Sequence, residues 1–214
     1  MRITTLVFAL VAVFTVCTTA CSGGKSLNSP EELKQYLDKQ PANSPDKPLK
    51  VSIDTDDQTL RDFAMAITSA GKYVSLNLSG SALTSIWGGV FENCKTLVSV
   101  TIPNSVTSIG DHAFLECTSL ASVTIPNSVI SIGINSFYSC TSLPSVTIPD
   151  SVTSIGSSAF YACNSLASVT FQGTIDSSNI HPGFPFPGDL RAKYLDGGPG
   201  TYTSEIGTAI WTKQ

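Results

Sequence analysis

The chain has 214 residues, of which 13% are charged and 42% hydrophobic, and its net charge is −4. The charged fraction is about half that of an average soluble protein. A nucleic-acid-binding protein needs a basic face, which this charge does not provide, and a chain this apolar is not disordered. Between residues 95 and 170 the only charged side chains are Lys95, Asp111, Glu116 and Asp150. We therefore expect neither an enzyme nor a cofactor.

Residues 1–20 are predicted to be a signal peptide. Arg2 precedes an apolar run over residues 6–16, which is too short to span a bilayer but suits a signal-peptide core. The run ends in Thr-Thr-Ala-Cys, which resembles the lipobox of bacterial lipoproteins. That resemblance implies cleavage before Cys21, lipidation of Cys21 and a tether over residues 21–29. The alternative is cleavage after Ala20 without lipidation, which gives a secreted protein.

An N-terminal capping region is predicted over residues 30–71. Its expected elements are a helix to about Gln40, a strand over 49–53 and a helix over 57–70. Ser29 and Glu32 have the spacing of a capping box at the first helix. Asp57 is expected to cap the second helix, and Gly71 to end it.

An internal repeat of 23 residues dominates the rest of the chain. The same residue types recur at this spacing in columns. These columns are Cys94, Cys117, Cys140 and Cys163; Phe91, Phe114, Phe137 and Phe160; Ile86, Ile109, Ile132 and Ile155; and Leu97, Leu120, Leu143 and Leu166. A single unit cannot bury its apolar residues, whereas stacked units can.

Each unit predicts one coil of a solenoid. Leu-x-Ser-Val-Thr-Ile alternates as a strand does, with Leu, Val and Ile facing inward, and the proline that follows ends the strand. Val-x-Ser-Ile leads to a glycine that permits a turn, and Ala-Phe-x-x-Cys is expected to be a short helical or 3₁₀ segment. The predicted fold is an α/β solenoid of about five coils over residues 72–188, with a parallel sheet on its concave face and a small α/β N-terminal cap.

Both ends of the stack depart from the repeat. Leu76 and Leu78 lie one position early relative to the later strands, as if one residue were inserted before Leu83. At the far end, residues 181–188 break the repeat, and residues 189–214 are expected to form a C-terminal cap or tail. Such ends shield the apolar surface of the terminal coils.

The string Val-Thr-Ile-Pro-Asn-Ser-Val-Thr-Ser-Ile-Gly, together with the 23-residue period, resembles the BspA-like leucine-rich repeats of treponemes and oral anaerobes. The resemblance covers roughly residues 73–193. It implies a leucine-rich repeat fold and a surface lipoprotein. Some members of that family are adhesins for host matrix proteins, or act in coaggregation between bacteria.

The candidate binding residues are the outward serines and threonines of the strands. They form two files, Ser99, Ser122, Ser145 and Ser168 beside Thr101, Thr124, Thr147 and Thr170. In leucine-rich repeats this face binds partners, and here it would bind weakly, through shape and hydrogen bonds. The alternative is that these residues are merely soluble strand formers.

No metal site is expected. The four repeat cysteines would lie along the stack, so the first and last are too far apart to share one zinc ion. Their parallel side chains disfavour disulfides, and we expect buried, unreactive thiols. His112 and His181 lie far apart in the repeat. Among Asp54, Asp56 and Asp57, a calcium site is less plausible than a helix cap.

These observations predict a non-enzymatic protein, lipid-anchored to the bacterial outer membrane and exposed at the cell surface. Its expected partners are host matrix proteins or proteins of other bacteria, and it would contact the membrane through the N-terminal lipid alone. The main alternative is a periplasm-facing structural protein without a host ligand. Lesser alternatives are a glycan binder and an ice binder.

Overall fold

The computed structural model describes residues 27–206 and 208–214, so the predicted signal peptide and Cys21 lie outside the described residues. The first elements are α1 (Pro30–Asp38), β1 (Leu49–Ser52), α2 (Leu60–Ala70), β2 (Val74–Asn77) and β3 (Ser85–Ile86). The repeat forms β4 (Leu97–Thr101), β5 (Ser108–Ile109), β6 (Ser122–Thr124), β7 (Ser131–Ile132), β8 (Ser145–Ile148), β9 (Ser154–Ile155) and β10 (Ser168–Phe171). The chain ends with a 3₁₀ helix (Ser177–Asn179), α3 (Leu190–Gly197), β11 (Gly200–Ser204) and β12 (Trp211–Lys213).

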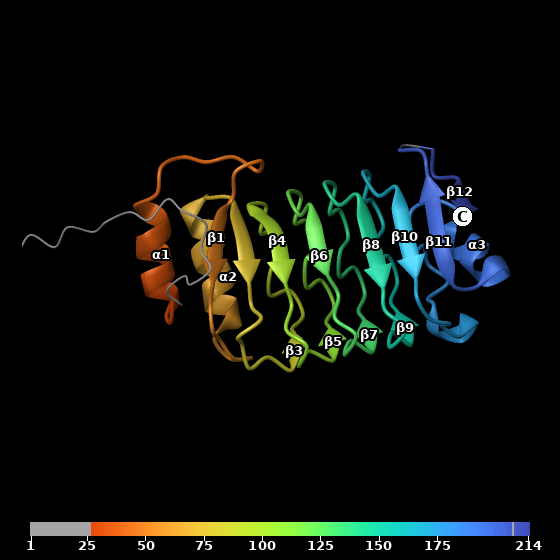
Figure 1. Ribbon diagram of the computed structural model, residues 1–214, viewed down its shortest axis with the longest axis horizontal. Coiled ribbons are helices and arrows are strands. Elements are labelled where there is room, and N and C mark those ends of the chain that lie inside the picture. The colour runs from red at the N-terminus through yellow and green to blue at the C-terminus, as the bar shows by residue number, and fades with distance from the viewer. Residues whose placement is uncertain (1–26, 207) are drawn as a thin grey trace, which may run out of the picture.

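The coils stack side by side in one row, which confirms the predicted parallel-sheet solenoid of about five turns (Figure 1). Each coil has three sides. The main side carries the longer strands, in the orders β1-β2-β4-β6 and β12-β11-β10-β8, and the second side carries the short strands β3-β5-β7-β9. The turn side consists of residues 87–94, 110–117, 133–140 and 156–163.

The residues around Ala-Phe-x-x-Cys form hydrogen-bonded turns rather than a helix, so the prediction of a short helical or 3₁₀ segment there is wrong. Backbone hydrogen bonds run between coils instead, from the N–H of Phe114 to the carbonyl of Ser136 and from that of Phe137 to Ala159, both 2.7 Å. Every second residue of the turn side donates its N–H to a carbonyl of the neighbouring coil. In a helix these N–H groups would instead bond within the same segment. Two columns of residues take positive φ here: Gly89, His112, Asn135 and Ser158, and Asn93, Glu116, Ser139 and Ala162.

The phenylalanine column forms the centre of the core. The rings of Phe91, Phe114, Phe137 and Phe160 are fully buried and stack with centroids 5.0 to 5.2 Å apart. Phe186 continues the column at 5.3 Å from Phe160. The same side chain in each coil thus packs on its own copies, which explains why the repeat keeps one residue type at this position.

The glycine after each short strand is needed for close approach between coils. Gly110, Gly133 and Gly156 do not have positive φ, so the expected turn-permitting role is wrong. A Cβ on Gly133 would lie 2.6 Å from the backbone nitrogen of Asp111, and one on Gly156 would lie 2.6 Å from that of Ile134. Neighbouring backbones therefore leave no room for a side chain at these positions.

The N-terminal region continues the stack with helices in place of turns. β1 pairs in parallel with β2, and α1 packs against α2. Ser29 Oγ accepts from the N–H of Glu32 at 3.1 Å, as a capping box predicts, while the Glu32 carboxylate accepts from Asn28. Gly71 ends α2 in the left-handed conformation, as expected.

Asp57 does not cap α2, contrary to the prediction. The N-cap residue is Thr59, and Asp56 Oδ1 accepts from the N–H groups of Gln58 and Thr59 at 3.0 Å. Asp57 instead accepts hydrogen bonds from the N–H and the hydroxyl of Thr84, which joins the helical region to the first coil. Burial opposes ionisation of Asp57, but these hydrogen bonds outweigh it and lower its pKa.

The structure contains the register shift that the sequence predicts for the first coil, and an extra residue later in the same coil compensates for it. Val74 pairs with Leu97, but Leu76 pairs with Val100, because a bulge lies between Val74 and Ser75. Leu76 is thus early by one position, as the sequence indicates. The extra residue before Leu83 restores the register for the short strands that follow.

At the C-terminal end, residues 181–188 belong to the stack rather than interrupting it. The N–H groups of Ser158 and Phe160 donate to the carbonyls of Gly183 and Pro185, at 3.1 and 2.7 Å. This last turn side lies 26 residues after the one before it, since the 3₁₀ helix lengthens the coil. β11 then pairs antiparallel with β10, and β12 with β11, so the chain reverses and extends the main sheet.

Candidate binding face

All eight predicted binding residues lie on the outward face of the main sheet. Ser99 pairs with Ser122 and Thr101 with Thr124, while Ser145 pairs with Ser168 and Thr147 with Thr170. Ser122, Thr124, Ser145 and Thr147 are exposed, and the other pairs are exposed or half-buried. The strand alternation that buries the leucine and valine of each coil therefore displays two parallel files of hydroxyl groups.

The hydroxyl files extend beyond the residues that the sequence indicated. At the N-terminal end Ser75 and Asn77 pair with Ser99 and Thr101. At the other end Thr203 and Thr201 pair with Ser168 and Thr170, and the Thr170 and Thr201 hydroxyls are 3.0 Å apart. The alternation of Thr201, buried Tyr202 and Thr203 is a detectable strand pattern within the segment predicted to be a C-terminal cap or tail.

The main sheet is interrupted in its middle. Within the described residues no ladder joins β6 to β8, although the two strands are neighbours. In the adjacent coils the N–H of Ala121 donates to Val98 and that of Ala167 to Pro144, at 2.8 and 2.9 Å. Pro144 occupies the equivalent position and has no N–H to donate to Ala121. Pro144 thus removes, between its own coil and the previous one, a backbone hydrogen bond that is present in the adjacent coils.

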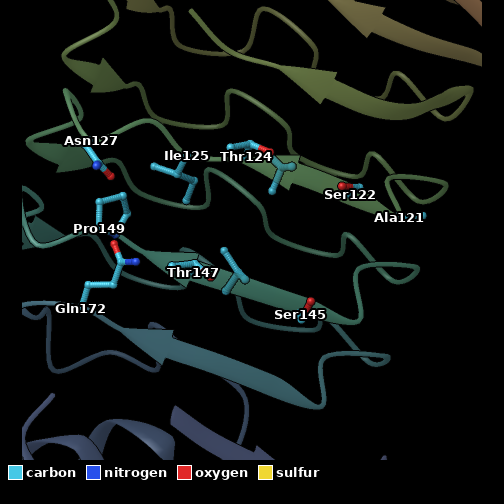
Figure 2. A pocket seen from close by; sticks show the side chains of 11 residues that line it. Ala121, Ser122, Thr124, Ile125, Asn127, Ser145, Thr147, Pro149 and Gln172 are labelled. Carbon is cyan, nitrogen blue, oxygen red and sulfur yellow. The ribbon is translucent and has the colours of Figure 1, made fainter. Parts of the chain in front are cut away.

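A shallow hollow of about 310 Å³ lies where β6 and β8 separate. Figure 2 shows Ser122 and Thr124 on one strand facing Ser145 and Thr147 on the next, with Asn127, Pro149 and Gln172 at one end. Val123 is partly exposed at this place, whereas its counterparts Val100 and Val146 are buried. The hollow therefore offers hydroxyl and amide groups above an apolar floor.

The four repeat cysteines are buried and free. The thiols of Cys117, Cys140 and Cys163 donate to the carbonyls of Phe91, Phe114 and Phe137, at 3.0, 3.2 and 3.1 Å. Burial raises the pKa of all four, that of Cys163 to about 12. These three thiols thus each donate to a carbonyl of the preceding coil, and a protonated thiol at neutral pH is a poor nucleophile and metal ligand.

Both histidines contact residues close to them on the turn side. His112 Nε2 lies 3.2 Å from the Asn135 amide nitrogen, and His181 Nδ1 accepts from the N–H of Gly183 at 2.9 Å. In residues 27–206 and 208–214, no three His, Cys, Asp or Glu side chains gather closely enough to hold a metal ion. The helices in the same residues are too short or too polar to cross a bilayer.

The fold and the face define a leucine-rich solenoid whose open sheet surface carries neutral side chains from β2 to β11, with Lys50 of β1 at its N-terminal end. The chain belongs to the BspA-type leucine-rich repeat family, whose model matches residues 68–181 in six copies. None of the curated proteins matches the chain.

The chain is similar to solved structures of three bacterial leucine-rich repeat proteins. A leucine-rich cell surface protein from Faecalibacterium prausnitzii is 29% identical, with a TM-score of 0.45, over 58% of this chain and 39% of that one. The leucine-rich repeat protein of T. pallidum is 29% identical over 57% and 58%, with a TM-score of 0.44. One from Bacteroides ovatus is 26% identical over 61% and 36%, with a TM-score of 0.46. The chain thus spans less than two thirds of each of them.

Proposed function

We propose that this protein is a non-enzymatic scaffold, exported and lipid-anchored through Cys21, whose main-sheet face binds host matrix proteins or proteins of other bacteria. The observation that carries the proposal is the outward face itself. It presents hydroxyl files from β2 to β11 with a hollow at their centre. Membership of a leucine-rich repeat family, whose members commonly bind proteins, supports the same conclusion.

Binding at this face relies on hydrogen bonds and shape. A face of neutral side chains gives little long-range attraction, so affinity should depend weakly on salt. It also lacks the aromatic and arginine anchors that dominate tight interfaces, so single contacts are expected to be weak. Many copies anchored on one membrane would raise the overall avidity without new contacts.

The test is solid-phase binding of the purified protein to fibronectin, to fibrinogen and to whole partner bacteria. A double variant Thr124→Lys and Thr147→Lys places two charges beside the hollow and should reduce binding at least tenfold. Thr107→Lys with Thr153→Lys places the same charges by the second side and should leave binding unchanged. Equal loss in both variants, or no binding by the unmodified protein, would contradict the proposal.

Lipidation and exposure need their own experiment. Cys21→Ala should abolish labelling by radioactive palmitate and release the protein from the membrane fraction. Protease treatment of intact cells should remove the unmodified protein. Survival of the protein under that treatment would instead favour the periplasm-facing alternative, since the outer membrane would then shield it.

A further inference from the structure

Three aromatic side chains form a file on the turn side, away from the hydroxyl face, and two of them are exposed while the first is half-buried. Tyr138, Tyr161 and Phe184 come from three successive coils. Their ring centroids are 5.9 Å apart between the tyrosines and 6.1 Å between Tyr161 and Phe184. Tyr161 is 42% exposed and Phe184 68% exposed. We refer to these three residues as the aromatic file.

Phe184 is not explained by folding. Its φ is +41°, in the column that Gly89, His112, Asn135 and Ser158 occupy in the earlier coils. A positive φ is unfavourable for a bulky residue, and most of this ring is in water, so little burial offsets the strain. Glycine or asparagine would suit the backbone better. Backbone strain that stability does not explain is a mark of functional sites.

The surroundings of the aromatic file offer an anionic ligand no cation to pair with. Between Thr118 and Pro187 the sequence holds no lysine or arginine, and the charged residue in the coil before, Glu116, donates its backbone N–H to the Tyr138 carbonyl. The other charged side chains of this stretch are Asp150 and Asp176. Asp150 lies beside Pro149 near the hollow of the main side, and Asp176 accepts from Ser178 in the 3₁₀ helix. A nucleic acid, whose bases also stack on aromatic rings, would need a basic groove along its backbone. An anionic ligand is therefore disfavoured, whereas a neutral one needs no cation at this site.

The arrangement of the rings favours a linear polymer over a folded protein. Protein interfaces concentrate their energy in anchors that fill desolvated pockets, whereas these rings stand in a row along the stack, one for each coil. A chain of sugars presents one C–H-bearing ring face after another, and rotation about its glycosidic bonds lets successive sugars follow the tilts of 31° and 55° between neighbouring aromatic rings. The negative π faces attract those C–H groups, and the two tyrosine hydroxyls can exchange hydrogen bonds with sugar hydroxyls.

We infer that the aromatic file is a binding site for a linear, uncharged polysaccharide, which runs along the solenoid axis and stacks its sugar rings on Tyr138, Tyr161 and Phe184. This site is separate from the main-sheet face, and it stands whether or not that face binds proteins. Through it one protein can contact a glycan on its turn side and a protein partner on its main side.

The experiment measures binding of the full-length purified protein to cellohexaose and chitohexaose by calorimetry and tyrosine fluorescence, with a polygalacturonate oligomer as the charged comparison. We expect binding of at least one neutral oligomer and none of the charged one. Phe184→Gly relieves the strained backbone, so its thermal midpoint should be equal or higher, while affinity falls at least tenfold. Tyr161→Ala should weaken binding similarly. Ile130→Ala, at an exposed apolar residue beside β7, should leave affinity unchanged.

Two results would overturn the inference. One is the absence of binding to both neutral oligomers. The other is unchanged affinity in Phe184→Gly. If that variant instead lost binding to fibronectin or fibrinogen while no oligosaccharide bound, the aromatic file would belong to a protein interface, and the polysaccharide assignment would be wrong.

Discussion

The two faces of the same strands repeat with the same period, but for different physical reasons. In β8 the side chain of Val146 is buried, while that of Thr147 is exposed to solvent. The inward columns repeat because each residue packs on its own copies, as the stacked phenylalanines do at 5.0 to 5.3 Å. The outward serines and threonines meet no such constraint, so their repetition follows either from strand propensity or from binding.

Periodicity alone therefore does not identify a site. Identity between coils is required by packing on the inside, and the fold permits variation on the outside. The outward positions that do vary are therefore informative. Pro144 departs from the alanine or valine of its counterparts and opens the sheet, and Tyr138 and Tyr161 have Glu92 and Leu115 as counterparts on the turn side.

The largest effect is expected for Phe137→Ala. The ring lies between Phe114 and Phe160 and is fully buried, so its loss leaves a cavity in the centre of the stack. The free energy of unfolding should fall by about 3–5 kcal/mol. Tyr138→Ala, at the next residue, removes a half-buried ring and should cost clearly less than Phe137→Ala. Urea unfolding followed by circular dichroism measures both, and similar losses would contradict the assignment of faces.

A smaller loss is expected for Val146→Thr, which keeps the shape of the side chain but places a hydroxyl in the core. Val146 faces inward and is 4% exposed, so the new hydroxyl has to be desolvated among apolar side chains. We expect the free energy of unfolding to fall by about 1–3 kcal/mol. An unchanged free energy of unfolding would contradict the burial of Val146, because it would mean that water reaches this part of the core.

The buried thiols predict a loss of stability at alkaline pH. An unfolded cysteine ionises near its ordinary pKa of 9.0, while burial raises the pKa of Cys163 to about 12 and that of the other three above 9.0. The unfolded state therefore releases protons that the folded state keeps, and stability falls as the pH rises above 9. Each thiol contributes up to about 1.4 kcal/mol per pH unit in this range.

The matched variant for this effect is Cys140→Ala. It loses the thiol that donates to the Phe114 carbonyl, so it should be less stable at neutral pH. Its stability should nevertheless fall less steeply between pH 9 and 11 than that of the unmodified protein. Parallel slopes in thermal unfolding over this range would show that Cys140 does not contribute.

Pro144→Ala tests the interruption of the main sheet. The variant regains an N–H that can donate to Ala121, but the unfolded chain gains freedom, so the net change in stability should be within about 1 kcal/mol. The local effect is larger. Amide hydrogen exchange at β6 and β8 should slow in the variant and stay unchanged at β4, and uniform exchange across the sheet would contradict the break.

Much of this architecture could be predicted from the sequence, because a period and an inward pattern determine a stacked coil. The strands, the buried cysteines and the hydroxyl files follow from the alternation of residues such as Val146 and Thr147. The turn side could not be predicted. Glu116 and Ser139 take a positive φ that their residue types disfavour, because their N–H groups donate to the carbonyls of Tyr138 and Tyr161 in the next coil and hold them there.

The site was only partly predictable for a similar reason. Ser145 and Thr147 keep the outward pattern, so nothing in the files themselves reveals that β8 is detached from β6. The cause is Pro144, whose missing N–H matters only once the register between coils is known. The place of Phe184 could not be predicted, because the last coil is lengthened and its column cannot be counted at 23 residues.

The smallest effect on stability, and the sharpest test of the outward face, is expected for Thr124→Val with Thr147→Val. Valine keeps the branched shape and the strand propensity of threonine but removes the hydroxyl. Because both positions are exposed beside the hollow, the free energy of unfolding should change by less than about 0.5 kcal/mol. If the hydroxyl files serve binding, affinity for the protein partner should fall several-fold in the solid-phase assay. If both affinity and stability are unchanged, these threonines serve only to form the strand. The test separates binding from strand propensity because the two variants of the side chain differ only in the hydroxyl group.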